Sequence, residues 1–211
     1  MMDPRLILAL ATIAAFTFST SARAEGLYLA MSLGGSSYKA DTSEADRDLV
    51  SAGATGLSSK LEKEDVAFKL QLGYKLNEHF AIEGGYVDLG NAKYSASFTG
   101  GSADIKVRAE GFNIAALGIV PIGEKFSLFG KVGVIYAYLS ANASGGGIAS
   151  GAGGSESSTK LKSHWSIGGD YALNNNWAVR AEFERFSDLG DKNSVGGVDV
   201  DLVSVGLICK F

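Results

Sequence analysis

Residues 198–211, Val-Asp-Val-Asp-Leu-Val-Ser-Val-Gly-Leu-Ile-Cys-Lys-Phe, decide the fold. Counting back from the end in steps of two gives only apolar side chains, at Phe211, Cys209, Leu207, Val205 and Val203. Because side chains alternate between the two faces of a strand, this pattern predicts a β-strand with one apolar face. In a soluble sheet protein, a terminal phenylalanine in register with that face has no evident role. In a transmembrane barrel it has one, because the outward side chains contact lipid and the last strand closes against the first.

The composition favours extended strands. The chain of 211 residues has 28 glycines and 2 prolines, and we find no 3.6-residue hydrophobic period after residue 24. Its one cysteine, Cys209, allows no intramolecular disulfide. The formal net charge of −4 argues against a nucleic-acid partner.

The N-terminus has the features of a secretory signal. Arg5 precedes the apolar run 6–18, and Ala22-Arg23-Ala24 is a small-residue cleavage site. An anchor helix is the alternative, but the run is shorter than the ~20 residues that a spanning helix needs. We therefore predict a signal peptide at residues 1–24 and one barrel domain at 25–211, located in the cell outer membrane.

Alternating hydrophobicity predicts seven strands before the closing one. Their approximate ranges are 26–36, 66–76, 80–86, 105–119, 126–139, 161–173 and 177–184. Three short turns (77–79, 121–125 and 174–176) alternate with four longer polar segments (37–64, 91–104, 140–159 and 187–197) that we expect to be loops. This alternation predicts an all-β, transmembrane, up-and-down antiparallel barrel of eight strands, with the short turns in the periplasm. A lipocalin-like soluble barrel is the alternative, but it would place the charged face outside.

The strand at 105–119 does not keep one phase. Lys106, Arg108 and Glu110 share the parity of the apolar Phe112 and Ile114. Either a bulge near residue 111 restores the alternation, or the charged half of the strand stands above the bilayer. The sequence leaves both options open.

Inward positions carry charges of both signs. We expect a lumen charge network formed by Lys69, Glu83, Lys131, Asp170, Arg180, Glu182 and Glu184. An eight-stranded barrel has room for little more than its own side chains, so these charges should pair into a plug. The alternative is a narrow pore in which the same residues line a water path.

No catalytic, cofactor or metal site is predicted. Ser163 and His164 are adjacent, but parity directs Ser163 to lipid and His164 into the lumen, so they diverge. We expect His164 to be an interior side chain bonded near Asp170 or Glu184. The protein is therefore predicted not to be an enzyme.

Residues 80–90, 121–133, 177–186 and the terminal Phe211 resemble the small outer-membrane β-barrel family of the OmpA transmembrane domain, OmpX and the opacity proteins. Val205, Leu207, Cys209 and Phe211 also resemble the assembly signal that the barrel-assembly machinery reads. The resemblance implies a surrounding of outer-membrane lipid and lipopolysaccharide. OmpA itself continues into a periplasmic peptidoglycan-binding domain, and we do not expect that role here.

We accordingly expect a structural and surface-interaction protein, an adhesin or host-contact factor whose four outer loops meet host-cell or matrix ligands. The alternative is a narrow porin that passes small solutes or ions. One barrel fold carries many functions, so the resemblance is specific for fold and weak for function.

Overall fold

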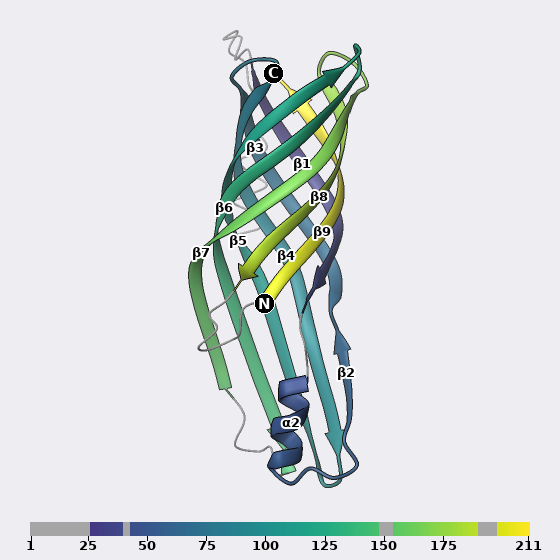
Figure 1. The fold of residues 1–211 in the computed structure, drawn as a ribbon, viewed down its shortest axis with the longest axis vertical. Coiled ribbons are helices and arrows are strands. Elements are labelled where there is room, and N and C mark those ends of the chain that lie inside the picture. The colour runs from purple at the N-terminus through teal and green to yellow at the C-terminus, as the bar shows by residue number, and fades with distance from the viewer. Residues whose placement is uncertain (1–25, 40–42, 148–153, 190–197) are drawn as a thin grey trace, which may run out of the picture.

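The computed structural model describes residues 26–39, 43–147, 154–189 and 198–211. The predicted signal peptide and residues 190–197 of the last predicted loop lie outside these ranges. Within them, nine antiparallel strands form one sheet, and eight of the nine close into a tall barrel (Figure 1). The prediction of an eight-stranded, all-β barrel is confirmed.

The barrel strands follow one another around the ring in chain order. They are β1 (Leu27–Tyr38), β3 (Glu64–Lys75), β4 (Phe80–Phe98), β5 (Gly101–Ile122), β6 (Phe126–Gly146), β7 (Gly154–Ala172), β8 (Trp177–Leu189) and β9 (Val198–Lys210). The closing strand β9 pairs with β1, so the two ends of the barrel sheet meet. The ninth strand, β2 (Ser58–Glu62), pairs with the outer part of β4.

Three predicted loops contain more regular structure than the sequence suggested. The range 91–104 consists of the ends of β4 and β5 joined by a turn at residues 99–100, and β6 and β7 extend far into 140–159. The range 37–64 holds β2 and a helix, α2 (Ser43–Ser51). These strands were missed because their outward side chains are polar and their inward ones are mostly small, which weakens the alternation.

The prediction that no 3.6-residue hydrophobic period follows residue 24 is wrong at α2. It is only 9 residues long, and its partly buried apolar residues Ala45 and Leu49 occupy one face, four positions apart. Two apolar residues are too few to raise a periodic signal. Among the described residues, no helix is long and apolar enough to cross a membrane.

The phase of β5 is settled by its pairing. β5 pairs with β6 without a register shift from Ser102 to Ile122, and its odd-numbered residues face inward throughout. Lys106, Arg108 and Glu110 therefore lie on the outer face, beyond the apolar zone. The irregularity lies on the neighbouring strand instead, between Asp88 and Asn91 of β4.

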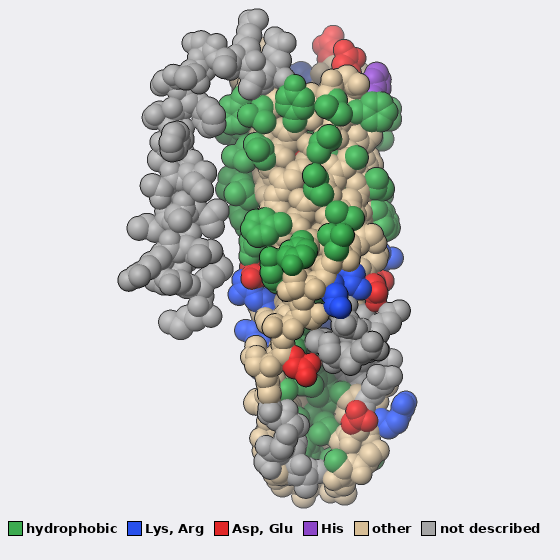
Figure 2. All heavy atoms as spheres, turned by 90° about the vertical axis from the view of Figure 1, so that its left-hand side faces the viewer, with side chains coloured by type: hydrophobic (Ala, Val, Ile, Leu, Met, Phe, Trp, Pro, Cys, Tyr) green, Lys and Arg blue, Asp and Glu red, His purple; other side chains and the backbone are tan. Residues whose placement is uncertain are grey.

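Leu27, Lys210 and the three short turns lie at one end of the barrel, and we call the half that holds them the periplasmic half, following the predicted topology, and the other the extracellular half. The outer wall of the periplasmic half carries an apolar belt. Large apolar side chains cover it, and charged side chains lie along its extracellular border (Figure 2). The side chain of Val66 is 71% exposed and that of Leu33 is 61% exposed. Exposing so large an apolar surface to water would be strongly unfavourable. A belt of this kind is the lipid-facing surface of a membrane barrel.

The lumen is layered. A periplasmic apolar layer contains Tyr28, Ala81, Leu117, Phe129 and Ile208, and a second apolar layer lies further out. The outer layer includes Tyr38, Ala67, Val87, Ile135 and Phe186. The charged inward residues of β4, β6 and β8 fall between the two layers in sequence, because each of these strands passes from one layer to the other, whereas β3 contributes only Ala67, to the outer layer.

The extracellular half has a core of its own. Inward residues Tyr94, Ala96 and Phe98 of β4 and Ala103 of β5 pack with Leu49 of α2. The carboxylate of Asp46, also on α2, accepts hydrogen bonds from the Tyr94 hydroxyl at 2.5 Å and from Ser59 at 3.1 Å. Burial and this carboxylate raise the pKa of Tyr94 to about 12, so the phenol remains a donor at neutral pH.

Candidate functional site

The seven charges predicted for the lumen meet in one continuous chain, which we call the ionic layer. It runs Asp170, Arg180, Glu83, Lys131, Glu182, Lys69 and Glu184, with the sign of the charge alternating at each step. Each side chain stands at an inward position of its strand, as parity required. The structure therefore brings together every member of the predicted network.

The contacts of the ionic layer are short. Lys69 Nζ lies 2.7 Å from Glu182 Oε2 and 2.7 Å from Glu184 Oε2. Lys131 Nζ lies 2.6 Å from Glu83 Oε2 and 2.8 Å from Glu182 Oε1. Every lysine of the layer thus bridges two carboxylates.

Arg180 connects side chains on opposite walls of the lumen. It donates to both oxygens of Asp170, at 2.8 and 2.9 Å, and also to Glu83. In the order of the ring, β8 and β4 are separated by three strands on either side, so the contact between Arg180 and Glu83 spans the lumen. A side-chain bridge between opposite walls is the arrangement that the predicted plug requires.

Burial makes the pairing obligatory. Lys69, Glu83, Lys131, Arg180, Glu182 and Glu184 are all buried, whereas Asp170 is half-buried. An unpaired ion in such a place costs several kcal/mol, and the idealised cost is larger still. The alternating chain offsets that cost because each buried charge has at least one opposite partner.

Neutral side chains complete the ionic layer, and sequence reasoning did not assign them to it. The Tyr28 hydroxyl donates to Glu83 at 2.7 Å, and Ser166 donates to Glu182 at 2.6 Å. The Phe129 ring lies 4.4 Å from the Arg180 guanidinium carbon. Their inward parity was visible in the sequence, but parity alone does not say which residues meet across the lumen.

His164 lies at the end of the chain. Its Nδ1 is 2.7 Å from Glu184 Oε1, and its ring stacks on Phe186 with centroids 5.3 Å apart. The expectation of an interior histidine near Asp170 or Glu184 is met by Glu184. Ser163 faces outward and is exposed, so the two side chains diverge as parity predicted.

Other inward lysines lie outside the ionic layer. Lys162 pairs with Asp188 at 2.9 Å on the extracellular side, and Lys75 stands at the periplasmic mouth. Within the described ranges, no group of three or more His, Cys, Asp or Glu side chains is arranged to hold a metal ion.

The four residues of the predicted assembly signal lie together on the lipid-facing wall. Val205, Leu207, Cys209 and Phe211 line a shallow apolar hollow over the seam between β1 and β9, with Leu29 and Trp177. Their outward direction agrees with the parity argument. Recognition by the barrel-assembly machinery stays a prediction.

Comparison with known proteins gives the same fold. Residues 7–211 match the family model of the outer membrane protein beta-barrel domain. The chain is 29% identical over 140 residues to outer membrane protein A of Yersinia pseudotuberculosis, covering 66% of this chain and 38% of that protein. It is 30% identical over 154 residues to the 31 kDa outer-membrane immunogenic protein of Brucella melitensis, covering 68% of this chain and 62% of that protein.

A solved structure shows the same architecture at lower identity. Neisserial surface protein A superposes with a TM-score of 0.57 at 16% identity, covering 88% of this chain and 97% of that one. The chain spans well under half the length of the outer membrane protein A relatives that it matches, about 38% in the first case. Family membership agrees with the predictions of an outer-membrane location and of a non-enzymatic protein. The chain belongs to the outer membrane protein beta-barrel domain family.

Proposed function

We propose that this outer-membrane barrel is a surface-interaction protein whose binding surface is the extracellular half of its own sheet. The observation that carries the proposal is the length of the strands. β4, β5 and β6 have 19, 22 and 21 residues, whereas crossing the bilayer takes ~9–11. About half of each strand therefore projects beyond the apolar belt.

The projecting sheet is open on two sides. Its order is β2, β4, β5, β6 and β7, because β7 begins to pair with β8 only at His164. Among the described residues, no strand pairs with the far edge of residues 154–159 of β7 or with the far edge of β2. Free edges present unpaired backbone donors and acceptors, which an extended segment of another protein can pair with.

Side-chain packing and hydrogen bonds hold the projecting sheet rigid. The core around Tyr94 and Phe98 and the Asp46 hydrogen bonds hold α2 and β2 against β4. A rigid edge lowers the entropic cost of binding, since only the incoming segment must be ordered. The partner class that fits best is an extended polypeptide, such as a segment of a host-cell or matrix protein.

The proposal can be tested by placing lysine side chains on the free edge of β7. Ser155→Lys and Ser157→Lys on β7 should strongly reduce adhesion of expressing cells to host cells or matrix, because lysine on an edge strand opposes strand addition. Ser97→Lys, near the end of β4 but paired with β2 on one side and β5 on the other, adds a lysine to the exposed face away from an edge and should leave adhesion unchanged. Equal loss in both variants would reject edge pairing.

A narrow porin remains the rival function, and the ionic layer argues against it. Single-channel recording of the purified protein in planar bilayers separates the two. Steady conductance together with an absence of host binding would replace the surface-interaction proposal.

A further inference from the structure

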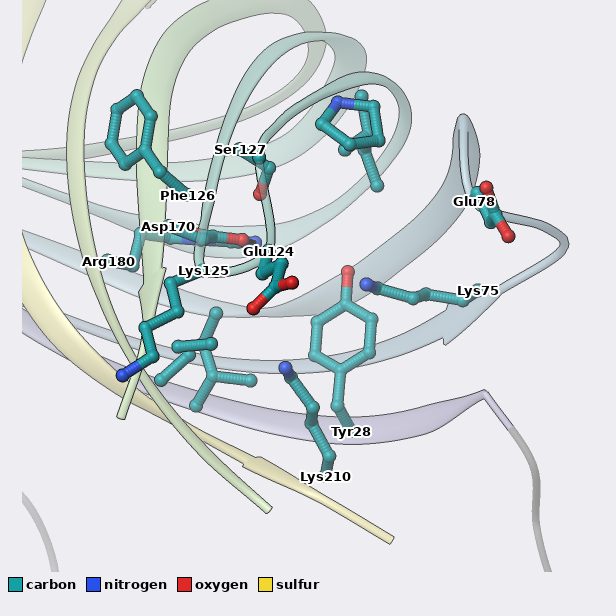
Figure 3. A pocket seen from close by; sticks show the side chains of 16 residues that line it. Tyr28, Lys75, Glu78, Glu124, Lys125, Phe126, Ser127, Asp170, Arg180 and Lys210 are labelled. Atoms are coloured by element: carbon teal, nitrogen blue, oxygen red, sulfur yellow. Dashed lines mark hydrogen bonds and ion pairs between the residues drawn. The ribbon is translucent and has the colours of Figure 1, made fainter. Parts of the chain in front are cut away.

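A cavity of about 260 Å³ lies at the periplasmic end of the lumen (Figure 3). We call it the vestibule. Its walls come from the start of β1, the ends of β3 and β9 and the turn between β5 and β6, and its floor is the periplasmic apolar layer together with Arg180 and Asp170. The cavity is much larger than the ~30 Å³ that one water occupies in the liquid, so it has room for a small solute.

The polar groups of the floor are already engaged. Arg180 donates to both oxygens of Asp170, and the Tyr28 hydroxyl donates to Glu83. Whatever binds in the vestibule must therefore be held by groups of the wall.

Two lysines of the wall supply those groups. Lys75 and Lys210 both stand at inward positions, on the two strands that flank β1, and Lys210 pairs directly with Tyr28. Figure 3 shows their ammonium groups pointing into the cavity on either side of the Tyr28 ring. Among the described residues, neither ammonium forms a close ion pair or a side-chain hydrogen bond, although Asp170 attracts Lys210 from a longer distance and Glu78 also borders the cavity.

Two like charges that face one partly enclosed space repel each other unless an anion lies between them. Each lysine ammonium offers three donors as a compact point charge, which suits a phosphate group with several oxygens. We propose that the vestibule binds a phosphate-class anion between Lys75 and Lys210, either free in the periplasm or as a lipid headgroup.

Glu124 is the natural competitor for this site. It lies on the turn between β5 and β6, and its carboxylate points into the vestibule (Figure 3). Its negative charge opposes an incoming anion. The neighbouring Lys125 also borders the vestibule, but its ammonium lies apart from Tyr28 and is directed away from Lys75 and Lys210 (Figure 3).

The experiment is a titration of the purified protein with inorganic phosphate in a maltoside detergent, at constant ionic strength, followed by amide NMR shifts around the vestibule. We expect saturable shifts that Lys75→Gln or Lys210→Gln weakens by about tenfold, the size of one charge-assisted hydrogen bond. Glu124→Gln should tighten binding severalfold. Lys125→Gln removes the same charge as the two test variants and should change the apparent Kd by less than twofold.

The outcome also separates the two sources of phosphate. In phosphatidylglycerol nanodiscs, a lipid occupant would produce the shifts without added phosphate and block the titration, whereas a free anion would titrate as in detergent. Equal weakening by Lys125→Gln and Lys210→Gln would overturn the site, because it would show only a general effect of charge. Absence of saturable shifts in the unmodified protein, with heat-modifiable gel mobility proving the barrel folded, would overturn it too.

Discussion

In the periplasmic half, β4 directs Ile82 to lipid and Glu83 into the lumen, whereas in the extracellular half it directs Lys93 to solvent and Tyr94 inward. β5 shows the same inversion without any change of phase, from outward Phe112 to outward Lys106. The backbone is continuous, but the medium outside it changes from lipid to water at the border of the apolar belt. Each half therefore places its apolar side chains where its own surroundings require them.

Among variants that probe the difference between the two halves, Arg180→Met should have the largest effect. The methionine removes the cation shared by Glu83 and Asp170, and Glu83 remains buried in the lumen. We expect the free energy of unfolding in detergent, measured by urea titration, to fall by roughly 3 kcal/mol. Unchanged stability accompanied by an ion-selective current would mean that the lumen is hydrated and open.

A smaller, local effect should follow Asp46→Ala. The variant removes the acceptor of Tyr94 and Ser59, so hydrogen exchange at α2 and β2 should speed up by the equivalent of about 1–2 kcal/mol. Exchange in the periplasmic half should not change. Asp48→Ala, on the same helix but without a side-chain hydrogen bond among the described residues, is the control and should have little effect.

Deletion of Phe211 tests whether the lipid-facing belt needs its terminal aromatic residue for assembly. If the terminal aromatic residue is read during assembly, the amount of folded protein in the outer membrane should fall severalfold in cell fractionation. Phe80→Ala removes another exposed aromatic residue of the same belt and should leave that amount nearly unchanged. A normal level of the deletion variant would show that the apolar pattern alone suffices.

The smallest effect is expected from Arg185→Met. Arg185 contacts Asp201 at 2.6 and 2.8 Å, but on the outer face just beyond the belt, where water screens the pair. We expect the free energy of unfolding, measured by the same urea titration, to change far less than for Arg180→Met. A loss as large as that of Arg180→Met would show that burial does not separate the two arginines.

The sequence predicted the barrel and the members of the ionic layer, because both depend on a period of two that each strand carries locally. Lys69, Lys131 and Arg180 could be placed inward from their own neighbours alone. Which carboxylate each one meets depends on strand registry across the lumen, which no single strand encodes. The same limit hid the vestibule, since Lys75 and Lys210 are far apart in the sequence and come together only because β1 pairs with both of their strands.

The extracellular half was harder to predict for a different reason. Its strands carry glycine, alanine and serine, as in the end of β6, Ser-Ala-Asn-Ala-Ser-Gly-Gly at residues 140–146, and such small residues alternate too weakly to mark a strand. Pairing with β5 and β7 makes this segment a strand, and packing against Tyr94 and Phe98 makes residues 43–51 a helix. Tertiary contacts decided both.

The lipid face of a strand such as β9 is tolerant of slippage. Val203, Val205 and Leu207 would look alike to the bilayer if the strand moved by two residues, because a shift of two keeps every side chain on its own face. The lumen is not tolerant. A two-residue shift of β8 would set Glu182 where Arg180 now meets Glu83, and two carboxylates would face each other. The charges inside the barrel thus favour a single alignment among several that the membrane would accept, so they help to specify the fold.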